Sequence, residues 1–387
     1  MRFKNSICGL AALLLLGCGN WSKPPISTVP QIQTYYGSST VGDFLQITVD
    51  IDNNSMNFSD LSTGVTTTAT YVLAADGGYE LDDATGNLVG GFESDDDELM
   101  VLMTNKAGAS QTTPALSIAV PSAQISISSV ANTKLNFFQL GTSRGGFEIG
   151  SGSFDATGDL ALSTYWPLGA SFEMIGTSPF HNGSFPVESV GQDPGGAFLT
   201  LTGVDGSTSY VFGNTHSYIV DRPNSTLLGF EQTASSAFDP IHAGSYKVNL
   251  LQKLGVTSTD GSDESVGSSF DVGTLVIFAN GNITLSNSKN NVIAEGQLAP
   301  VANQTNLYNE SPFFSLKDPC LGVFTFHVNS TAAAPGALGS SSQVTVQTTQ
   351  DVFIGFRGDA VVLASFTKYS TPGSEGPYDY FYGFGHN

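Results

Sequence analysis

Three short segments place a serine where neighbouring residues could activate it as a nucleophile. Residues 141–145 (GTSRG) match the pattern G-x-S-x-G, in which a sharp turn from a strand into a helix exposes the serine hydroxyl. Residues 286–289 and 365–368 match S-x-x-K, which needs a helical turn to bring the lysine to the serine. Runs typical of β-strands surround all three segments, so we interpret them as hairpin or strand residues without a catalytic role.

Carboxylates that could hold a cation are concentrated in residues 93–98 (ESDDDE), where Asp95, Asp96 and Asp97 are the calcium candidates. Crowded carboxylates repel one another unless a cation or water lies between them. Charged residues also keep the edge of a sheet from pairing with another chain, and we favour this interpretation of the segment as a solvated hairpin loop. The histidines are scattered and lack the short spacings of zinc motifs. We therefore predict no cofactor, with calcium as the alternative.

The densest aromatic stretch outside the expected strands lies between residues 165 and 186. Flat rings beside an acid or an amide form surfaces that can hold sugars, although a long loop pinned on a barrel by its aromatic side chains has the same composition. We favour the pinned loop, but we take the stretch as the candidate ligand-binding site because loops on rigid scaffolds carry function. The candidate residues are Tyr165, Trp166, Phe172, Glu173, Phe180 and His181.

Beyond residue 30, these candidates must be positioned by β-structure. Long segments with a period of 3.6 residues are absent, and short runs rich in Val, Ile, Thr, Tyr and Phe alternate with Gly, Asn and Asp turns. We therefore predict an all-β protein. Two polar insertions, 255–269 and 330–343, are expected to be loops because their composition cannot bury a core.

Two sequence pieces recur in the same order along the chain. A strand–turn–strand piece occupies residues 44–59, 146–163 and 275–286. An apolar strand that ends in Gly-Phe and a charged residue occupies residues 88–93, 227–231 and 353–357. We predict three tandem antiparallel β units, small barrels or sandwiches, at 31–125, 126–240 and 241–387. The alternative is a single β-propeller, and the aromatic C-terminus, 378–387, is expected to be the closing strand of the third unit.

The first eighteen residues have the layout of an export signal. Arg2 and Lys4 precede an apolar run of about ten residues, whereas a bilayer span needs about twenty. The run ends in Leu-Gly-Cys and resembles the lipobox of bacterial lipoproteins. This resemblance implies a signal peptide at 1–17, acylation of Cys18 and a lipid-anchored tether at 18–30. Because Gly19 and not an aspartate follows the cysteine, it also implies the outer membrane in preference to the inner one.

The body also resembles, loosely, uncharacterised bacterial secreted β-repeat lipoproteins. The resemblance lies in turns such as residues 154–159 (FDATGD) and 280–282 (NGN) within Gly- and Thr-rich hairpins. These motifs describe turn chemistry, so the resemblance implies no activity and no functional residue.

The charge balance and the cysteines limit the partners. The chain has 13 basic and 34 acidic residues and a formal charge of −21, so it would repel phosphate backbones and we predict no nucleic-acid partner. Cys8 would leave with the signal and Cys18 would be acylated. Cys320 then stands alone and forms no disulfide within the chain.

Together these patterns predict an exported protein anchored in the membrane through lipid on Cys18 and facing the periplasm or the cell surface. We expect a non-catalytic binding or structural module with a glycan or protein ligand. One alternative is a glycan-binding adhesion protein. The other is a hydrolase whose two carboxylates come from different units and lie roughly 5 to 9.5 Å apart in a cleft.

Overall fold

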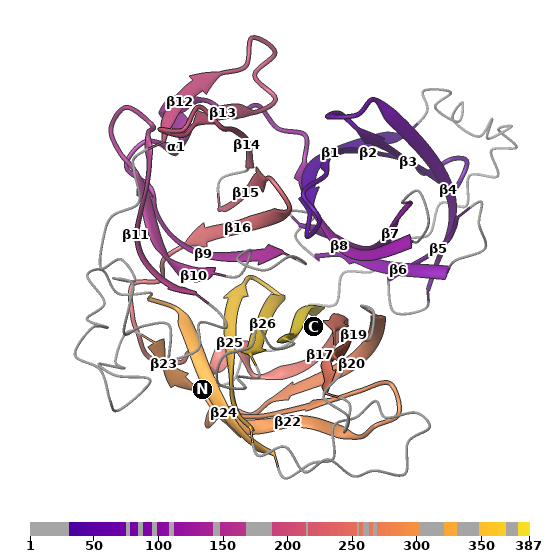
Figure 1. Ribbon diagram of the computed structural model, residues 1–387, viewed down its shortest axis with the longest axis vertical. Helices are drawn as coiled ribbons and strands as arrows, with labels where there is room; N and C mark the ends of the chain where they lie inside the picture. The colour runs from indigo at the N-terminus through magenta and orange to yellow at the C-terminus, as the bar shows by residue number, and fades with distance from the viewer. Residues whose placement is uncertain are drawn as a thin grey trace, which may run out of the picture.

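The computed structural model describes residues 31–74, 78–83, 88–94, 99–107, 112–141, 148–167, 188–213, 216–253, 255–257, 263–265, 269–301, 321–330, 348–368 and 378–387. Apart from a short α-helix and a 3-10 turn, the regular structure of these residues is β-strand. Three large antiparallel sheets follow one another along the chain and surround a common centre (Figure 1). We call each sheet with its connections the first, second and third unit.

The first unit is a closed barrel in which every strand pairs with the next and the last pairs with the first. Its strands are β1 (Ile32–Ser39), β2 (Phe44–Asp50), β3 (Ser55–Asp60), β4 (Val65–Leu73), β5 (Tyr79–Asp83), β6 (Leu88–Glu93), β7 (Met100–Ala107) and β8 (Thr112–Pro121). An eight-stranded barrel has an interior just wide enough for side chains. Here Tyr35, Ile47, Met56, Leu81 and Leu102 are all buried.

The second unit begins with α1 (Ile127–Val130) and contains an eight-stranded sheet in the order β11-β10-β9-β16-β15-β14-β13-β12. The strands are β9 (Lys134–Gly141), β10 (Glu148–Phe154), β11 (Leu160–Pro167), β12 (Ser189–Gln192), β13 (Leu199–Thr202), β14 (Thr208–Gly213), β15 (Ser217–Arg222) and β16 (Ser225–Glu231). Two backbone hydrogen bonds of 3.1 and 3.0 Å join Leu160 to Glu188 and bring the two edges of the sheet together. The unit is therefore nearly closed.

The third unit follows η1 (Pro240–His242) and contains a nine-stranded sheet in the order β22-β21-β20-β17-β27-β26-β25-β24-β23. The strands are β17 (Gly244–Lys253), β20 (Ser269–Ile277), β21 (Asn282–Ser286), β22 (Val292–Gln297), β23 (Ala299–Pro300), β24 (Val323–Ser330), β25 (Thr348–Arg357), β26 (Ala360–Lys368) and β27 (Tyr378–His386). As expected, the aromatic C-terminus is a strand of this unit, and it joins β17 to β26.

One of the two polar insertions differs from its expected structure. Within residues 255–269, β18 (Gly255–Thr257) and β19 (Asp263–Ser265) pair as a separate two-stranded hairpin. Thr and Val have high β propensity, and a hairpin that lies outside the large sheet needs no apolar face to form its backbone hydrogen bonds. The insertion at 330–343 lies outside the described residues after Ser330.

The prediction of an all-β chain with three tandem antiparallel units is confirmed. The alternative of a single propeller is wrong, because each unit is one sheet of eight or nine strands and not a pair of four-stranded blades. Local turn chemistry accounts for the agreement. The two residues between β15 and β16, for example, include Asn224 at a φ of 63°, a left-handed conformation that asparagine tolerates.

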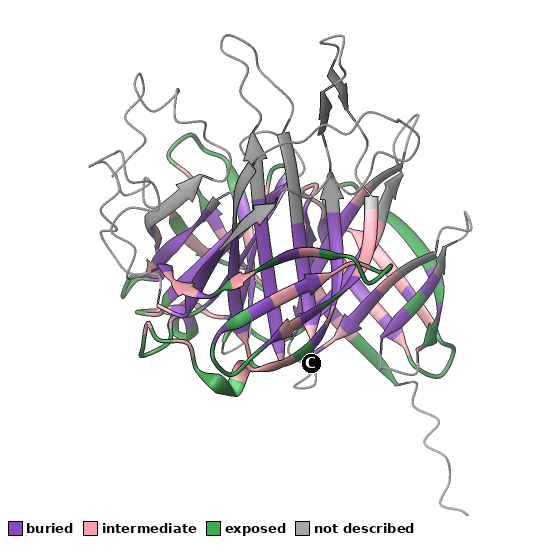
Figure 2. Ribbon diagram, turned by 90° about the horizontal axis from the view of Figure 1, so that it is seen from below, coloured by how far each residue is buried: buried purple, intermediate pink, exposed green. Residues whose placement is uncertain are grey.

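The strands of the three units run between two common ends. The lower end, where the C-terminus lies in Figure 2, includes Gln31, the turn 51–54 and Asn387. The upper end includes the turns 61–64 and 223–224. Because β11 starts at Leu160 on the lower side and runs upward, it ends at the upper end.

The largest core cluster joins all three units. A barrel strand normally alternates between apolar inward and polar outward residues, but several strands here are buried on both faces where the units meet. Every residue of β16 from Ser225 to Phe230 is buried. The outward-facing members of this junction include Phe44, Val101, Phe138, Phe230, Phe353 and Phe384. The three units therefore form one packed body.

Candidate functional site

Most of the candidate residues from the sequence lie outside the described part of the chain. These are Cys18, Asp95, Asp96, Asp97, Phe172, Glu173, Phe180 and His181. The backbones of Tyr165 and Trp166 belong to β11, where they pair with Gly150 and Ile149, but their side chains are not among those described. Their proposed roles stay predictions.

The structure does describe both stems of the aromatic stretch. On the first side, β11 is paired with β10 as far as Pro167, opposite Glu148. On the other side, Glu188 makes two backbone hydrogen bonds with Leu160. A rigid barrel therefore holds the segment 168–187 at each end, and the segment starts at the upper end of the second unit.

A largely buried ion pair fixes the second stem. Nη1 of Arg222, at the end of β15, donates a hydrogen bond of 2.6 Å to Oε1 of Glu188, and the two side chains are 15% and 16% exposed. The same nitrogen lies 3.4 Å from the hydroxyl of Ser209. Nε of Arg222 and Oε2 of Glu188 are among the described buried atoms that have no hydrogen-bond partner. Removing either charge would leave the other buried, which is costly.

The first and second units meet through a hydrogen bond and a group of aromatic rings. The hydroxyl of Ser38 in β1 donates to Oδ1 of Asp221 in β15 at 2.6 Å. Beside it, the ring of Phe44 lies 4.6 Å from that of Tyr210 and 4.9 Å from that of Phe212. Rings at these separations attract one another in addition to burying apolar area.

The third unit is attached to both of the others. The Tyr382 hydroxyl donates to the carbonyl oxygen of Gly141 at 3.0 Å, and Nδ2 of Asn136 donates to the carbonyl oxygen of Leu321 at 2.7 Å. Tyr382 and Asn136 are both fully buried. At the lower end, the ring of His386 stacks on Phe92 of the first unit at 4.6 Å.

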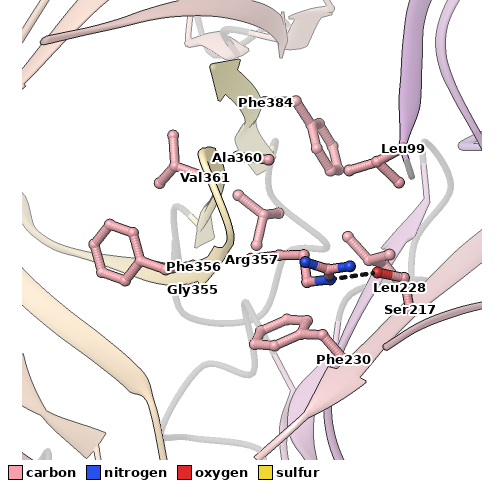
Figure 3. Close-up of a pocket in the computed structure, with 11 residues that line it drawn as sticks. Leu99, Ser217, Leu228, Phe230, Gly355, Phe356, Arg357, Ala360, Val361 and Phe384 are labelled. Atoms are coloured by element: carbon pink, nitrogen blue, oxygen red, sulfur yellow. Dashed lines mark hydrogen bonds between the residues drawn. The ribbon is translucent and has the colours of Figure 1, made fainter. Parts of the chain in front are cut away.

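A small cavity lies where the three units meet (Figure 3). Leu99 comes from the first unit, Ser217 and Phe230 from the second, and Arg357 and Phe384 from the third. Nε of Arg357 donates to the Ser217 hydroxyl at 3.1 Å. The cavity volume is about 10 Å³, which is room for about one water molecule. None of the described residues that line it is a carboxylate, so it does not provide the cleft that the hydrolase alternative requires.

The lower mouth of the first barrel is filled by polar side chains that satisfy one another. Glu93 accepts hydrogen bonds from the hydroxyls of Tyr35 and Tyr79, the latter at 2.8 Å. Burial raises the pKa of the neighbouring Tyr71, and the negative charges of Asp50 and Glu93 raise it further. Glu93, the charged residue that ends the repeated apolar strand in the first unit, therefore accepts hydrogen bonds inside the barrel.

Two further properties concern only the described residues. No group of three or more His, Cys, Asp or Glu side chains there is arranged to hold a metal ion. Nor does this part of the chain include a helix with the length and apolar character needed to cross a bilayer. The calcium candidates at 95–97 lie outside it and stay predictions.

The sequence patterns did not predict the junction between the units, where the hydrogen bonds and ring contacts described above join one unit to another. A signal was present in β16, where the residues from Ser225 to Phe230 are apolar or small on both faces and do not alternate. Such runs are typical of strands buried on both sides. They indicate that a second surface covers the strand, but they do not indicate which residues supply it.

No protein-family model matches the chain, and no curated protein matches it in sequence. Among solved structures, it is similar to transferrin binding protein B, a vaccine antigen from Haemophilus parasuis. One mutant form is 11% identical with a TM-score of 0.29, and the alignment covers 92% of this chain and 77% of that chain. A double mutant is 12% identical with a TM-score of 0.27, covering 92% and 76%. Values at this level establish no common family, so nothing about ligands is carried over.

Proposed function

We propose that the chain is a lipid-anchored, non-catalytic glycan-binding protein of the cell envelope. The observation that supports this most is that the predicted tether and the start of the aromatic stretch lie at opposite ends of the body. Gln31, where the predicted tether joins the body, lies at the lower end, whereas β11 leads into the aromatic stretch at the upper end. A protein held at its lower end would present the start of that stretch away from the membrane.

Two interior regions formed by described residues have no room for an enclosed ligand. The inward side chains of the first barrel are buried against one another, and the cavity at the junction has room for about one water molecule. Small-molecule sites are far larger, about 300 to 1,000 Å³. An extended polymer that contacts an exposed surface fits this architecture better than a small enclosed molecule.

The rigidity of the body supports the same proposal. Binding residues work best when packed elements hold their backbones in place. Here β11 is paired along its length, and the Arg222–Glu188 ion pair holds the other stem. Tyr165 and Trp166 come at the end of β11, so both residues belong to a backbone that is already paired.

The test of binding is retention of the purified body on a polysaccharide array. We expect Trp166→Ala to weaken retention at least tenfold without changing the melting temperature, because stacking of a sugar on a ring depends on that ring. Phe278→Ala is the matched control, since it removes an exposed ring (52% exposed) from the lower end. Unchanged retention in Trp166→Ala, or an equal loss in both variants, would contradict the glycan proposal.

The test of anchoring is separate. In bacterial cells that process lipoproteins, the wild-type chain should incorporate labelled palmitate and sediment with membranes. Cys18→Ser should lose the label, because the thiol is the acylated group. Label that persists in Cys18→Ser would remove the lipidation proposal while leaving glycan binding untouched.

A further inference from the structure

Exposed apolar side chains gather at the lower end of the first barrel. Ile32 is 54% exposed, Ile51 40%, Val72 66% and Leu73 61%. We call these four residues the lower rim. They come from the start of β1, the turn after β2 and the end of β4, and the backbone bonds from Ile51 to Gln31 and from Tyr71 to Asn54 bring these segments together.

Apart from Leu61 and Val65 at the upper end, the exposed surface of β3 and β4 has a different composition. Halfway up the same strands, the outward positions are polar, and the Thr68 hydroxyl donates to Asn57 at 2.7 Å while Ser59 and Thr66 lie 3.1 Å apart. Exposed apolar residues that occur singly are ordinary, but a group of them marks a contact surface. The lower rim is therefore a candidate contact surface.

The chain itself indicates what this surface meets. The amide of Gln31 donates to Oδ2 of Asp52 at 3.2 Å, and its carbonyl accepts from the amide of Ile51 at 3.1 Å. Residues 18–30 therefore join the body inside the lower rim. At about 3 Å per residue, a proline-rich tether of this length reaches at most about 40 Å from a lipid on Cys18. The part of the body nearest to the bilayer is then the lower end.

The lower end of the third unit presents two more apolar side chains. Ile241 is 78% exposed in η1, and Phe278 is 52% exposed in the turn after β20. The stacking of Phe92 on His386 places the lower ends of the first and third units side by side. A flat membrane surface could therefore contact both units at once.

We propose that the lower rim, with Ile241 and Phe278, inserts into the interfacial layer of the lipid bilayer and sets the body upright on it. This inference rests on the proposed acylation of Cys18. Apolar side chains at the boundary of headgroups and acyl chains gain from losing contact with water. Asp50 and Asp52 lie beside the lower rim, and the chain is acidic overall, so neutral zwitterionic lipids should be preferred to anionic ones.

The experiment uses the chain from residue 18 with a histidine tag ahead of it, held on phosphatidylcholine vesicles by a nickel-chelating lipid. Cys18→Ser and Cys320→Ser remove the native thiols, and Leu73→Cys carries an environment-sensitive fluorophore. Brominated acyl chains quench a fluorophore that enters the bilayer. Val65→Cys is the matched control, because Val65 is 60% exposed on the same strand at the upper end.

We expect quenching at position 73 to exceed that at position 65 at least threefold, and to fall to the control value when Ile51→Asp and Val72→Asp are added. Anionic vesicles should give less quenching. Equal quenching at the two positions, or quenching that survives both aspartates, would overturn the proposal. A second result would also overturn the proposal: a shift in the emission of the fluorophore at position 73 without vesicles, together with dimerisation of the protein. A second copy of the chain would then cover the lower rim. The chelating lipid anchors the chain whether or not cells acylate Cys18, so failure of lipidation is detected separately by palmitate labelling.

Discussion

The hydroxyl of Ser38 and the carboxylate of Asp221 form a hydrogen bond of 2.6 Å between residues 183 positions apart in the chain. Both side chains are buried at the boundary of the first two units. A carboxylate in such a place needs donors, because burial without them is costly. The pair is thus a long-range link that holds the first barrel against the second.

The first prediction concerns this link. Ser38→Ala removes a donor to a buried carboxylate, and we expect it to lower the free energy of unfolding by about 1–3 kcal/mol. Urea denaturation followed by fluorescence measures the change. Ser59→Ala is the control, because it removes a hydroxyl from the outer barrel surface and should cost less than about 0.5 kcal/mol. Equal losses of free energy of unfolding in the two variants would show that the buried hydrogen bond stabilises the protein no more than an exposed one does.

The second prediction concerns the close approach of the second and third units at Gly355. A Cβ added there would lie 2.5 Å from Cζ of Phe230 and 3.1 Å from Cε2 of Phe138. Both rings are packed in the junction, so Gly355→Ala should lower the free energy of unfolding by about 1–3 kcal/mol. The melting temperature and the urea midpoint should fall together.

Two further variants locate the cause of that loss. Phe230→Leu added to Gly355→Ala should recover part of the stability lost by the single change, because it removes the atoms nearest to the new methyl group. Gly90→Ala is the matched strand-glycine control, since the nearest atom is the flexible methyl end of Met103 at 3.0 Å. If Gly90→Ala were as costly as Gly355→Ala, backbone effects and not the unit contact would be responsible.

The third prediction concerns pH. Burial lowers the pKa of His242, which Asp239 raises to a smaller extent, and the imidazole stacks on Phe356 at 4.5 Å. In the unfolded chain the ring takes up a proton as the pH falls through about 6.5, before it does so in the folded protein. The unfolded state then binds more protons, so this residue lowers the free energy of unfolding from about pH 6.5 down to its folded pKa.

The variant that isolates this contribution is His242→Phe, which keeps a flat ring on Phe356 but cannot take up a proton. Between pH 7.5 and 5.5, urea midpoints should fall less in His242→Phe than in the wild type. Ile241→Phe, a change at the exposed neighbouring position, should keep the wild-type slope. Parallel pH profiles for wild type and His242→Phe would contradict the assignment.

The sequence predicts the units well because the signals for hairpins are local. Residues such as Asn54 and Gly281 adopt positive φ in the turns that separate paired strands, and their types reveal this without any tertiary information. The order of the three sheets follows from the repetition of those hairpins.

The junction could not be predicted in the same way. Phe138, Phe230 and Gly355 come into contact only because two separate sheets pack together, and no short-range pattern links them. Burial on both faces of β16 indicates a covering surface without identifying it. For the candidate site, the structure adds the two stems of the aromatic stretch, at β11 and Glu188, while the roles of Trp166, His181 and the 95–97 carboxylates stay predictions.

The position of Gln31 at the start of β1 also decides how the body would respond to mechanical load. β1 is hydrogen-bonded along one side to β2 and along the other to β8. Its hydrogen bonds lie across the strand, so a pull along the strand axis loads many of them at once and does not open them one after another. If a ligand were held at the upper end and the tether pulled from the lower end, force would enter the protein in shear, the direction in which a strand paired on both sides is hardest to remove.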